Sequence, residues 1–164
     1  MWTLVIISHI LMFVSFVMLS FSAFKGHFIS SISGDLTLNS YSIAAIMVYV
    51  FTQSIIFFLI IAINKNMNTI IVENDFKIKN DAYKKYKKQM HIHTSSNILV
   101  ISTLAILFGA VHTGLMNIYI HNILFVIGVF HYGYVIKIQY LCFKEISKII
   151  LQINQFTFSK LQDS

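Results

Sequence analysis

Four long apolar blocks, separated by polar segments, dominate the pattern of this chain. The first two are uncharged runs over residues 2–24 and 41–63, and the other two cover 97–118 and 120–143. Each block is long enough to cross the ~30 Å hydrocarbon core of a bilayer as an α-helix. None shows the alternation expected of a membrane β-barrel strand. The pattern predicts an all-α fold, an antiparallel four-helix transmembrane bundle in which residues 1–164 form a single domain.

Two of the polar segments carry most of the charge. Residues 64–96 form a predicted loop with seven lysines, and residues 144–164 form a tail with three more. In the tail, one stripe of a helix contains Ile146, Ile149, Ile150 and Ile153, with lysine and glutamine elsewhere. An apolar stripe of this kind is typical of a helix that lies in the membrane interface. We therefore predict a short interfacial helix at the C-terminal end, with a frayed extension of the fourth span as the alternative.

The lysine distribution predicts the orientation of the chain. The connection between the first two blocks has only Lys25, and the short connection at 119–121 has no lysine. Lysine-rich segments stay on the cytoplasmic side of a membrane, or on the equivalent matrix side. Four crossings put both termini and the 64–96 loop on that side. The expected location is a bacterial inner membrane or an organellar inner membrane.

Composition supports this interpretation and narrows the partners. Apolar residues make up 57% of the chain and charged residues 11%, whereas a soluble domain carries about 25% charge. The net charge of +6 lies mainly in a loop held against a membrane, so we expect no nucleic-acid partner. The expected partners are the lipid bilayer and other membrane-protein subunits. A single cysteine, Cys142, excludes an intrachain disulfide.

The candidates for chemistry are histidines inside the apolar blocks. At ~1.5 Å per residue, His9 and His131 occupy nearly the same depth, somewhat inside the midplane. The first and fourth helices of a bundle are often neighbours, so these two side chains are predicted to face each other. His112 and His121 flank the outer turn and form a second group.

Two facing imidazoles are the ligand set of a bis-histidine b-type haem, and apolar walls would hold the macrocycle. In histidine placement across four spans, the chain is similar to small four-helix membrane cytochromes and to haem-bearing anchor subunits of respiratory enzymes. That resemblance implies haem b as cofactor and a role in electron transfer. The predicted iron ligands are His9 and His131, followed by His112 and His121.

Two other functions remain open. In the first, the protein is a cofactor-free accessory, assembly or anchor subunit, and its histidines bond helix to helix. In the second, it is a small histidine-lined transporter, whose neutral midplane histidines relay protons together with Gln53, Tyr132 and Tyr134 or bind Cu or Zn transiently. No phosphate-binding loop, Ser-His-Asp set, HExxH motif or intramembrane carboxylate pair is present, so no residue pattern supports a hydrolase or kinase. The sequence offers no independent catalytic constellation, and a redox protein of this kind would be an electron-transfer subunit.

Small and polar residues also predict which helix faces pack. In the third block, Ser102, Ala105, Gly109 and His112 form one predicted packing stripe. In the second block, Ala45, Tyr49, Thr52 and Gln53 form another. His91 and His93 precede the third block and are expected to be solvated at the headgroups.

Overall fold

The computed structural model describes residues 2–25, 40–73 and 81–162, and all of its regular structure is α-helical. The helices are α1 (Trp2–Phe24), α3 (Ser40–Glu73), α4 (Asp81–His112) and α5 (Ile118–Gln162). All four are long and apolar enough to span a membrane. The prediction of an all-helical chain with four helices of membrane-spanning length is therefore confirmed.

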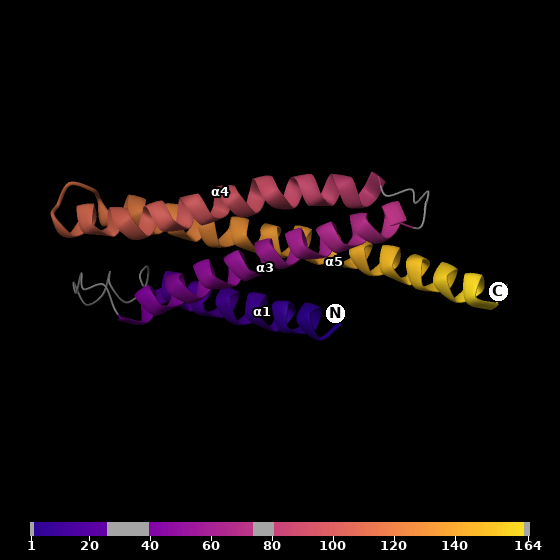
Figure 1. The fold of residues 1–164 in the computed structure, drawn as a ribbon. Coiled ribbons are helices and arrows are strands. Elements are labelled where there is room, and N and C mark those ends of the chain that lie inside the picture. The colour runs from indigo at the N-terminus through magenta and orange to yellow at the C-terminus, as the bar shows by residue number, and fades with distance from the viewer. Residues whose placement is uncertain (1, 26–39, 74–80, 163–164) are drawn as a thin grey trace.

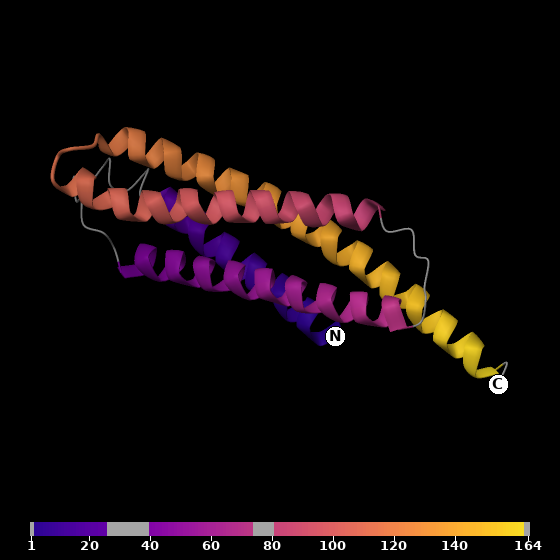
Figure 2. The ribbon, with the colours of Figure 1, turned by 45° about the horizontal axis from the view of Figure 1, so that its top comes forward.

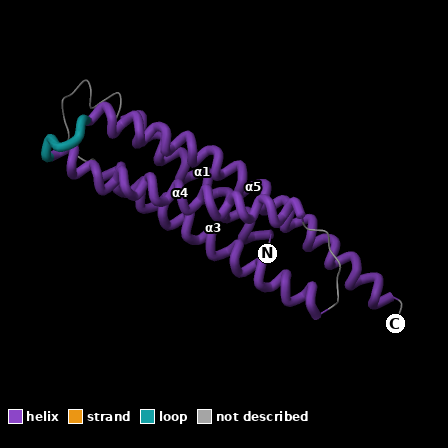
Figure 3. Tube along the Cα trace, turned by 90° about the horizontal axis from the view of Figure 1, so that it is seen from above, coloured by secondary structure: helices purple, strands orange, loops and turns teal. Residues whose placement is uncertain are grey.

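The helices form a long, narrow bundle in which successive helices run in opposite directions (Figure 1, Figure 2). Viewed from above, all four lie along one long axis (Figure 3). Helix α5 packs against α4 and α1, while α3 packs against α1 and α4. The expected contact between the first and fourth helices is thus present. We call the end where α3 finishes and α4 begins the lysine end, and the end where α4 meets α5 the turn end.

The helices extend well beyond the predicted spans at the lysine end. Residues 64–73 and 81–96 are helical, so the predicted loop over 64–96 is wrong for those residues, and 74–80 lie outside the described part. The extensions are held by tertiary packing, because Tyr83 is buried and its hydroxyl donates to Asn64 Oδ1 at 2.9 Å. The high charge content of residues 64–96 does not reveal that one face of each helical extension is buried.

The predicted tail is the end of α5 and does not form a separate short helix. Helix α5 continues without a break from Ile118 to Gln162. The stripe of Ile146, Ile149 and Ile153 is buried in an apolar cluster that also contains Met67 of α3 and residues of α4. The apolar stripe of the tail therefore packs against α3 and α4. Packing on neighbouring helices and lying on a membrane surface both require one apolar face, so the same sequence pattern fits either.

The turn between α4 and α5 lies at residues 113–117, earlier than the predicted break at 119–121. Gly114 has a φ of 75°, and Leu115 N–H donates to Ala110 O at 2.9 Å. These features form a Schellman motif, which ends a helix at a left-handed glycine. Asn117 then caps α5 by accepting a hydrogen bond from Tyr119 N–H at 2.8 Å. The predicted span 97–118 consequently ends at His112.

Exposed large apolar side chains form a belt around the bundle. The belt runs from Leu4 to Phe24 on α1, Ile43 to Ile61 on α3, Ile92 to Leu107 on α4 and Tyr119 to Tyr140 on α5. These stretches are about 22–32 Å long at 1.5 Å per residue, close to the ~30 Å core of a bilayer. Ile70 and Leu151 are exposed farther out, beyond the first lysines. The belt has the dimensions of a lipid-facing surface.

Candidate functional site

A network of uncharged polar side chains lies in the middle of the bundle. It separates an apolar cluster at the lysine end from a second apolar cluster toward the turn end. All four helices contribute to it, through side chains that are at most 1% exposed: Ser15, Tyr49, Thr52, Gln53, Thr94, Asn97, Tyr132 and Gln139. Burying so many polar groups is unfavourable unless they bond to one another. Most of the network's polar atoms do.

Tyr132 connects three helices at the centre of the network. Its hydroxyl lies 2.6 Å from Ser15 Oγ of α1 and accepts a hydrogen bond from Gln53 Nε2 of α3 at 2.9 Å. Gln53 Oε1 in turn accepts from Gln139 Nε2 at 2.7 Å, and Gln139 Nε2 also lies 3.2 Å from Thr94 Oγ1 of α4. One continuous chain of hydrogen bonds therefore joins all four helices.

Asn97 of α4 is the second centre. Its Oδ1 accepts from the Tyr49 hydroxyl at 2.5 Å, and its Nδ2 donates to the carbonyl of Gly128 at 3.0 Å. Because a carbonyl oxygen can only accept, the Gly128 bond fixes which way the amide points. Nδ2 is also 3.1 Å from Nδ1 of His131. We therefore assign His131 Nδ1 as an acceptor.

This assignment determines the tautomer of His131. A neutral imidazole that accepts at Nδ1 carries its proton on Nε2. His131 Nε2 lies 3.3 Å from Nδ1 of His93, so the Nε2–H of His131 donates a hydrogen bond to His93. The ring of Tyr134 packs at 5.1 Å from the ring of His93. Both ring nitrogens of His131 are thus engaged: Nδ1, which holds the in-plane lone pair, accepts from Asn97, and Nε2–H donates to His93.

His9 lies elsewhere on the bundle. Its Nδ1 donates to the carbonyl of Val5 at 2.7 Å, and its ring contacts those of Tyr140 and Phe143, each with centroids 5.7 Å away. Those two residues come 9 and 12 positions after His131 on α5, which places them about 14–18 Å farther along the helix. The structure does not bring His9 and His131 together as an axial pair.

The outer histidines lie beside the turn end. His121 is 6% exposed and donates from Nε2 to the carbonyl of Leu104 at 2.8 Å. Its ring packs against Phe108 at 5.4 Å and stacks on Phe125 at 6.4 Å. His112 is the last residue of α4, and its side chain lies outside the described part. His121 therefore ties the start of α5 to α4.

Four buried polar atoms have no hydrogen-bond partner among the described residues. Two belong to histidines, Nε2 of His9 and Nδ1 of His121, and two belong to the central network, Thr52 Oγ1 and Gln139 Oε1. An ordered water commonly satisfies such an atom in a buried polar site. The two histidine nitrogens are acceptors, because each ring already donates from its other nitrogen.

The predicted packing faces were partly correct. Tyr49, Thr52 and Gln53 are completely buried, which confirms the polar stripe of the second block. The stripe through Ser102, Ala105 and Gly109 is wrong: Gly109 is exposed, and a Cβ placed there would meet nothing within 4 Å. The buried face of α4 instead contains Thr94, Asn97, Ile101, Leu104 and Val111.

The sequence did not identify four network residues, Ser15, Thr94, Asn97 and Gln139, or the adjoining His93 as functional. His93 is half-buried and bonded to His131, so its predicted solvation at the headgroups is wrong. A spacing signal exists, because His93 and Asn97 are four residues apart and share one helix face. That signal could not show which helix they meet.

The chemistry available in the network is hydrogen bonding. The network residues include no carboxylate and no thiol, and within the described ranges no group of three or more His, Cys, Asp or Glu residues could hold a metal ion. No protein-family model, curated protein or solved structure matches the chain.

A first prediction concerns Tyr132. Tyr132→Phe removes the hydroxyl that bonds Ser15 and Gln53 and keeps the ring contact with Tyr49, whose centroid is 4.8 Å away. We expect a loss of about 1–2 kcal/mol in the free energy of unfolding, measured by denaturant titration in mixed micelles. Tyr134→Phe on the exposed side of α5 is the matched control and should change stability by less than about 0.5 kcal/mol. Equal effects of the two substitutions would contradict a stabilising role for the Tyr132 hydroxyl.

Proposed function

We propose that this chain is a multi-pass membrane protein that serves as an accessory, assembly or anchor subunit. In this proposal its histidines and amides hold the helices in register without a cofactor. The observation that carries the proposal is His131, whose two ring nitrogens bond Asn97 and His93 and so join α5 to α4. Interhelical bonds of this kind are a known means of stabilising membrane bundles.

The apolar belt supports the membrane part of the proposal. Its exposed side chains would meet lipid or the spans of other subunits, and its length fits a bilayer core. We infer that the lysine end, with both termini, lies on the cytoplasmic or matrix side, because residues 64–96 and 144–164 carry ten of the twelve lysines.

The test combines absorption spectroscopy with stability. We expect the detergent-purified protein to show no Soret band, before or after reduction with dithionite and after addition of haem. His131→Ala should lower the free energy of unfolding by about 1–2 kcal/mol, because it removes two hydrogen bonds between α4 and α5. A Soret band that disappears in this variant would refute the cofactor-free role of His131.

A second candidate function, b-type haem binding in an electron-transfer subunit, is favoured by His9 and His121. Each donates one ring N–H to a backbone carbonyl and keeps its other nitrogen buried without a described partner. Metal-ligating histidines are commonly oriented in this way. The two lie about 30 Å apart along α5, since His9 packs near Tyr140. They would therefore serve two haems, each with a second ligand from outside the described residues.

This candidate makes a distinct spectroscopic prediction. A protein isolated with its native partners would show low-spin α and β bands on reduction, and His9→Ala and His121→Ala would each remove about half of that signal. The interpretation rests on ligation at two separate sites. It fails if the spectrum is flat, or if either substitution leaves the bands unchanged in a folded protein.

A further inference from the structure

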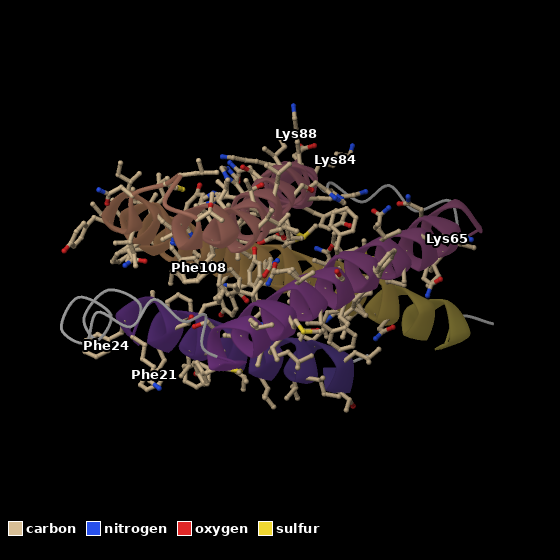
Figure 4. All side chains as sticks on the ribbon, turned by 90° about the vertical axis from the view of Figure 1, so that its left-hand side faces the viewer. Phe21, Phe24, Lys65, Lys84, Lys88 and Phe108 are labelled. Atoms are coloured by element: carbon tan, nitrogen blue, oxygen red, sulfur yellow. The ribbon has the colours of Figure 1, made fainter. Side chains whose placement is uncertain are left out.

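Lys137 is an exposed lysine that lies inside the apolar belt. On α5 it comes between Tyr134 and Tyr140, which are 45% and 50% exposed and belong to the belt. Lys84 and Lys88, by contrast, project from α4 beyond the end of the belt on that helix (Figure 4). Along its own helix, Lys137 therefore has belt residues on both sides.

Contacts to α3 give the depth of Lys137 in the bundle. Gln53 of α3 donates to the Tyr132 hydroxyl at 2.9 Å and accepts from Gln139 at 2.7 Å. Lys137 lies between those two residues of α5, so it is about level with Gln53. From Gln53 the belt on α3 continues for eight residues to Ile61, about 12 Å. In a hydrocarbon core of ~30 Å, a depth of about 12 Å is close to the midplane.

Helix α1 gives the same depth. The ring of His9 lies 5.7 Å from that of Tyr140, and the belt on α1 continues from His9 for five residues to Leu4, about 7.5 Å. Lys137 precedes Tyr140 by three residues, which is about 4.5 Å deeper. It is thus about 12 Å from the edge of the belt on α1 as well. Lysines that snorkel to the interface lie near the ends of a span.

The belt is shorter on α4, which packs against this part of α5. The ring of His93 lies 5.1 Å from that of Tyr134, and His93 is one residue from the end of the belt at Ile92. Ser96 is exposed three residues along the same face of α4. Polar groups therefore interrupt the apolar surface on the α4–α5 side of the bundle, at a depth where α1 and α3 remain apolar.

The described residues supply no counter-charge to Lys137. Among them, the one ion pair joins Lys148 to Glu145, at 2.7 Å. Glu145 lies eight residues beyond Lys137 on α5, about 12 Å farther toward the lysine end. The cation–π contacts of the described residues belong to Lys25 at the opposite end of the bundle. A charged side chain inside a membrane is costly and is usually paired, so the ammonium group of Lys137 calls for a carboxylate from another molecule.

A second copy of this chain has no carboxylate at this depth. The acidic residues of the sequence are Asp35, Glu73, Asp75, Asp81, Glu145 and Asp163. Each lies outside the stretches that form the belt. Two copies that met through the same face would also bring two Lys137 side chains together, and like charges repel. The counter-charge therefore has to come from a different protein.

We infer that the exposed face of α5 docks a transmembrane helix of another protein, and that a carboxylate near the middle of that helix pairs with Lys137. The exposed residues that lead to Lys137 are spaced alternately by three and four positions: Ile120, Ile123, Ile127, Phe130, Tyr134 and Lys137. Side chains with this spacing form the seam of a left-handed helix pair. The inference deepens the proposed role as an accessory, assembly or anchor subunit and rests on it.

Designed transmembrane peptides provide the test. The full-length protein is reconstituted in phosphatidylcholine vesicles with a polyleucine peptide that carries one central glutamate, or glutamine in the matched peptide. Energy transfer from Trp2, the single tryptophan, to dansyl groups at both peptide ends measures association. We expect the wild type to bind the glutamate peptide about tenfold more tightly than the glutamine peptide. Lys137→Met should abolish this preference. Lys144→Met, seven residues farther along the same face of α5 and outside the belt, should keep it.

A charge exchange distinguishes an ion pair from apolar packing. Lys137→Glu should lose the preference for the glutamate peptide and should bind a peptide with a central lysine more tightly than the glutamine peptide. Circular dichroism confirms that each variant is folded. A folded Lys137→Glu variant that binds the lysine and glutamine peptides equally would contradict the ion pair.

The outcomes separate the docking face from the proposed function on which it rests. Failure of the folded wild type to float with the vesicles refutes the membrane location and the proposed function with it. An inserted wild type that binds the glutamate and glutamine peptides equally overturns the docking face alone, as expected if Lys137 reaches lipid phosphates instead. A preference that persists in Lys137→Met places the site elsewhere and also overturns it. Equal losses in Lys137→Met and Lys144→Met overturn it in favour of a general surface potential.

Discussion

Asn97→Leu is expected to destabilise the bundle by about 2–3 kcal/mol, more than any other single loss of hydrogen bonds. The substitution keeps the approximate volume of the side chain and removes its bonds to Tyr49, Gly128 and His131. It also leaves the buried Tyr49 hydroxyl and the half-buried His131 without those partners, which adds to the cost. Unfolding in mixed micelles, followed by far-ultraviolet circular dichroism, measures the loss.

Asn68→Leu is the matched control, because Asn68 is exposed on α3 and the same change there removes no buried bond. We expect the control to lie within about 0.5 kcal/mol of the wild type. A double variant, Asn97→Leu with Tyr49→Phe, should cost less than the sum of the single changes, because the two side chains share one bond. Strict additivity would show that the Tyr49–Asn97 bond contributes nothing.

The four-helix architecture could be predicted from the sequence, because it depends on long apolar blocks. Each predicted span corresponds to one helix, and the polar stripe of Tyr49, Thr52 and Gln53 is buried as expected. The turn position was also encoded, in Gly114 and Asn117, but a hydropathy pattern does not distinguish a left-handed glycine from any other small residue. Local backbone chemistry therefore refined what hydropathy alone had placed four to six residues too late.

The helical extensions could not be predicted from charge. Lysine-rich segments are typical of loops, yet the intervening Tyr83 and Met90 are buried against neighbouring helices. Helix stability in such segments comes from tertiary packing more than from intrinsic propensity. The partner surface, which includes Met67 of α3 and Ile149 of α5, is distant in the sequence. A single chain without an alignment gives no signal for that pairing.

The candidate site shows a similar limit. Counting residues from the predicted edges of the spans put His9 and His131 at similar depths, but the structure sets them about 14–18 Å apart along α5. The lengthwise offset between α1 and α5, which pairs Ser15 with Tyr132, is not supplied by residue counts. The direction of each side chain depends on helix rotation and tilt, which residue counts do not supply. In the structure His131 points toward Asn97 and His93 of α4, whereas His9 packs on Tyr140 of α5. The identity of the neighbouring helix was correct, and the pairing of side chains across it was not found.

Gly128→Leu is expected to separate α4 from α5 and to cost about 3 kcal/mol or more. A Cβ at Gly128 would lie 2.7 Å from Cδ1 of Ile101 and 3.7 Å from Cγ1 of Val100. The Gly128 carbonyl also accepts from Asn97, so a shift of the helices weakens the polar network as well. Loss of the folded form on size-exclusion chromatography and a lower unfolding midpoint would measure the effect.

Gly128→Ala gives the more discriminating result, because the closest atom is the flexible end of the Ile101 side chain. We expect a loss of about 1 kcal/mol. Ile101→Val removes the clashing Cδ1, so the double variant should be more stable than the sum of the two single changes predicts. Gly109→Ala is the control: its Cβ would meet nothing within 4 Å, and alanine should stabilise the helix by about 0.5–1 kcal/mol. If Gly128→Ala stabilised the protein as much as Gly109→Ala, the close approach of α4 and α5 at this glycine would be refuted.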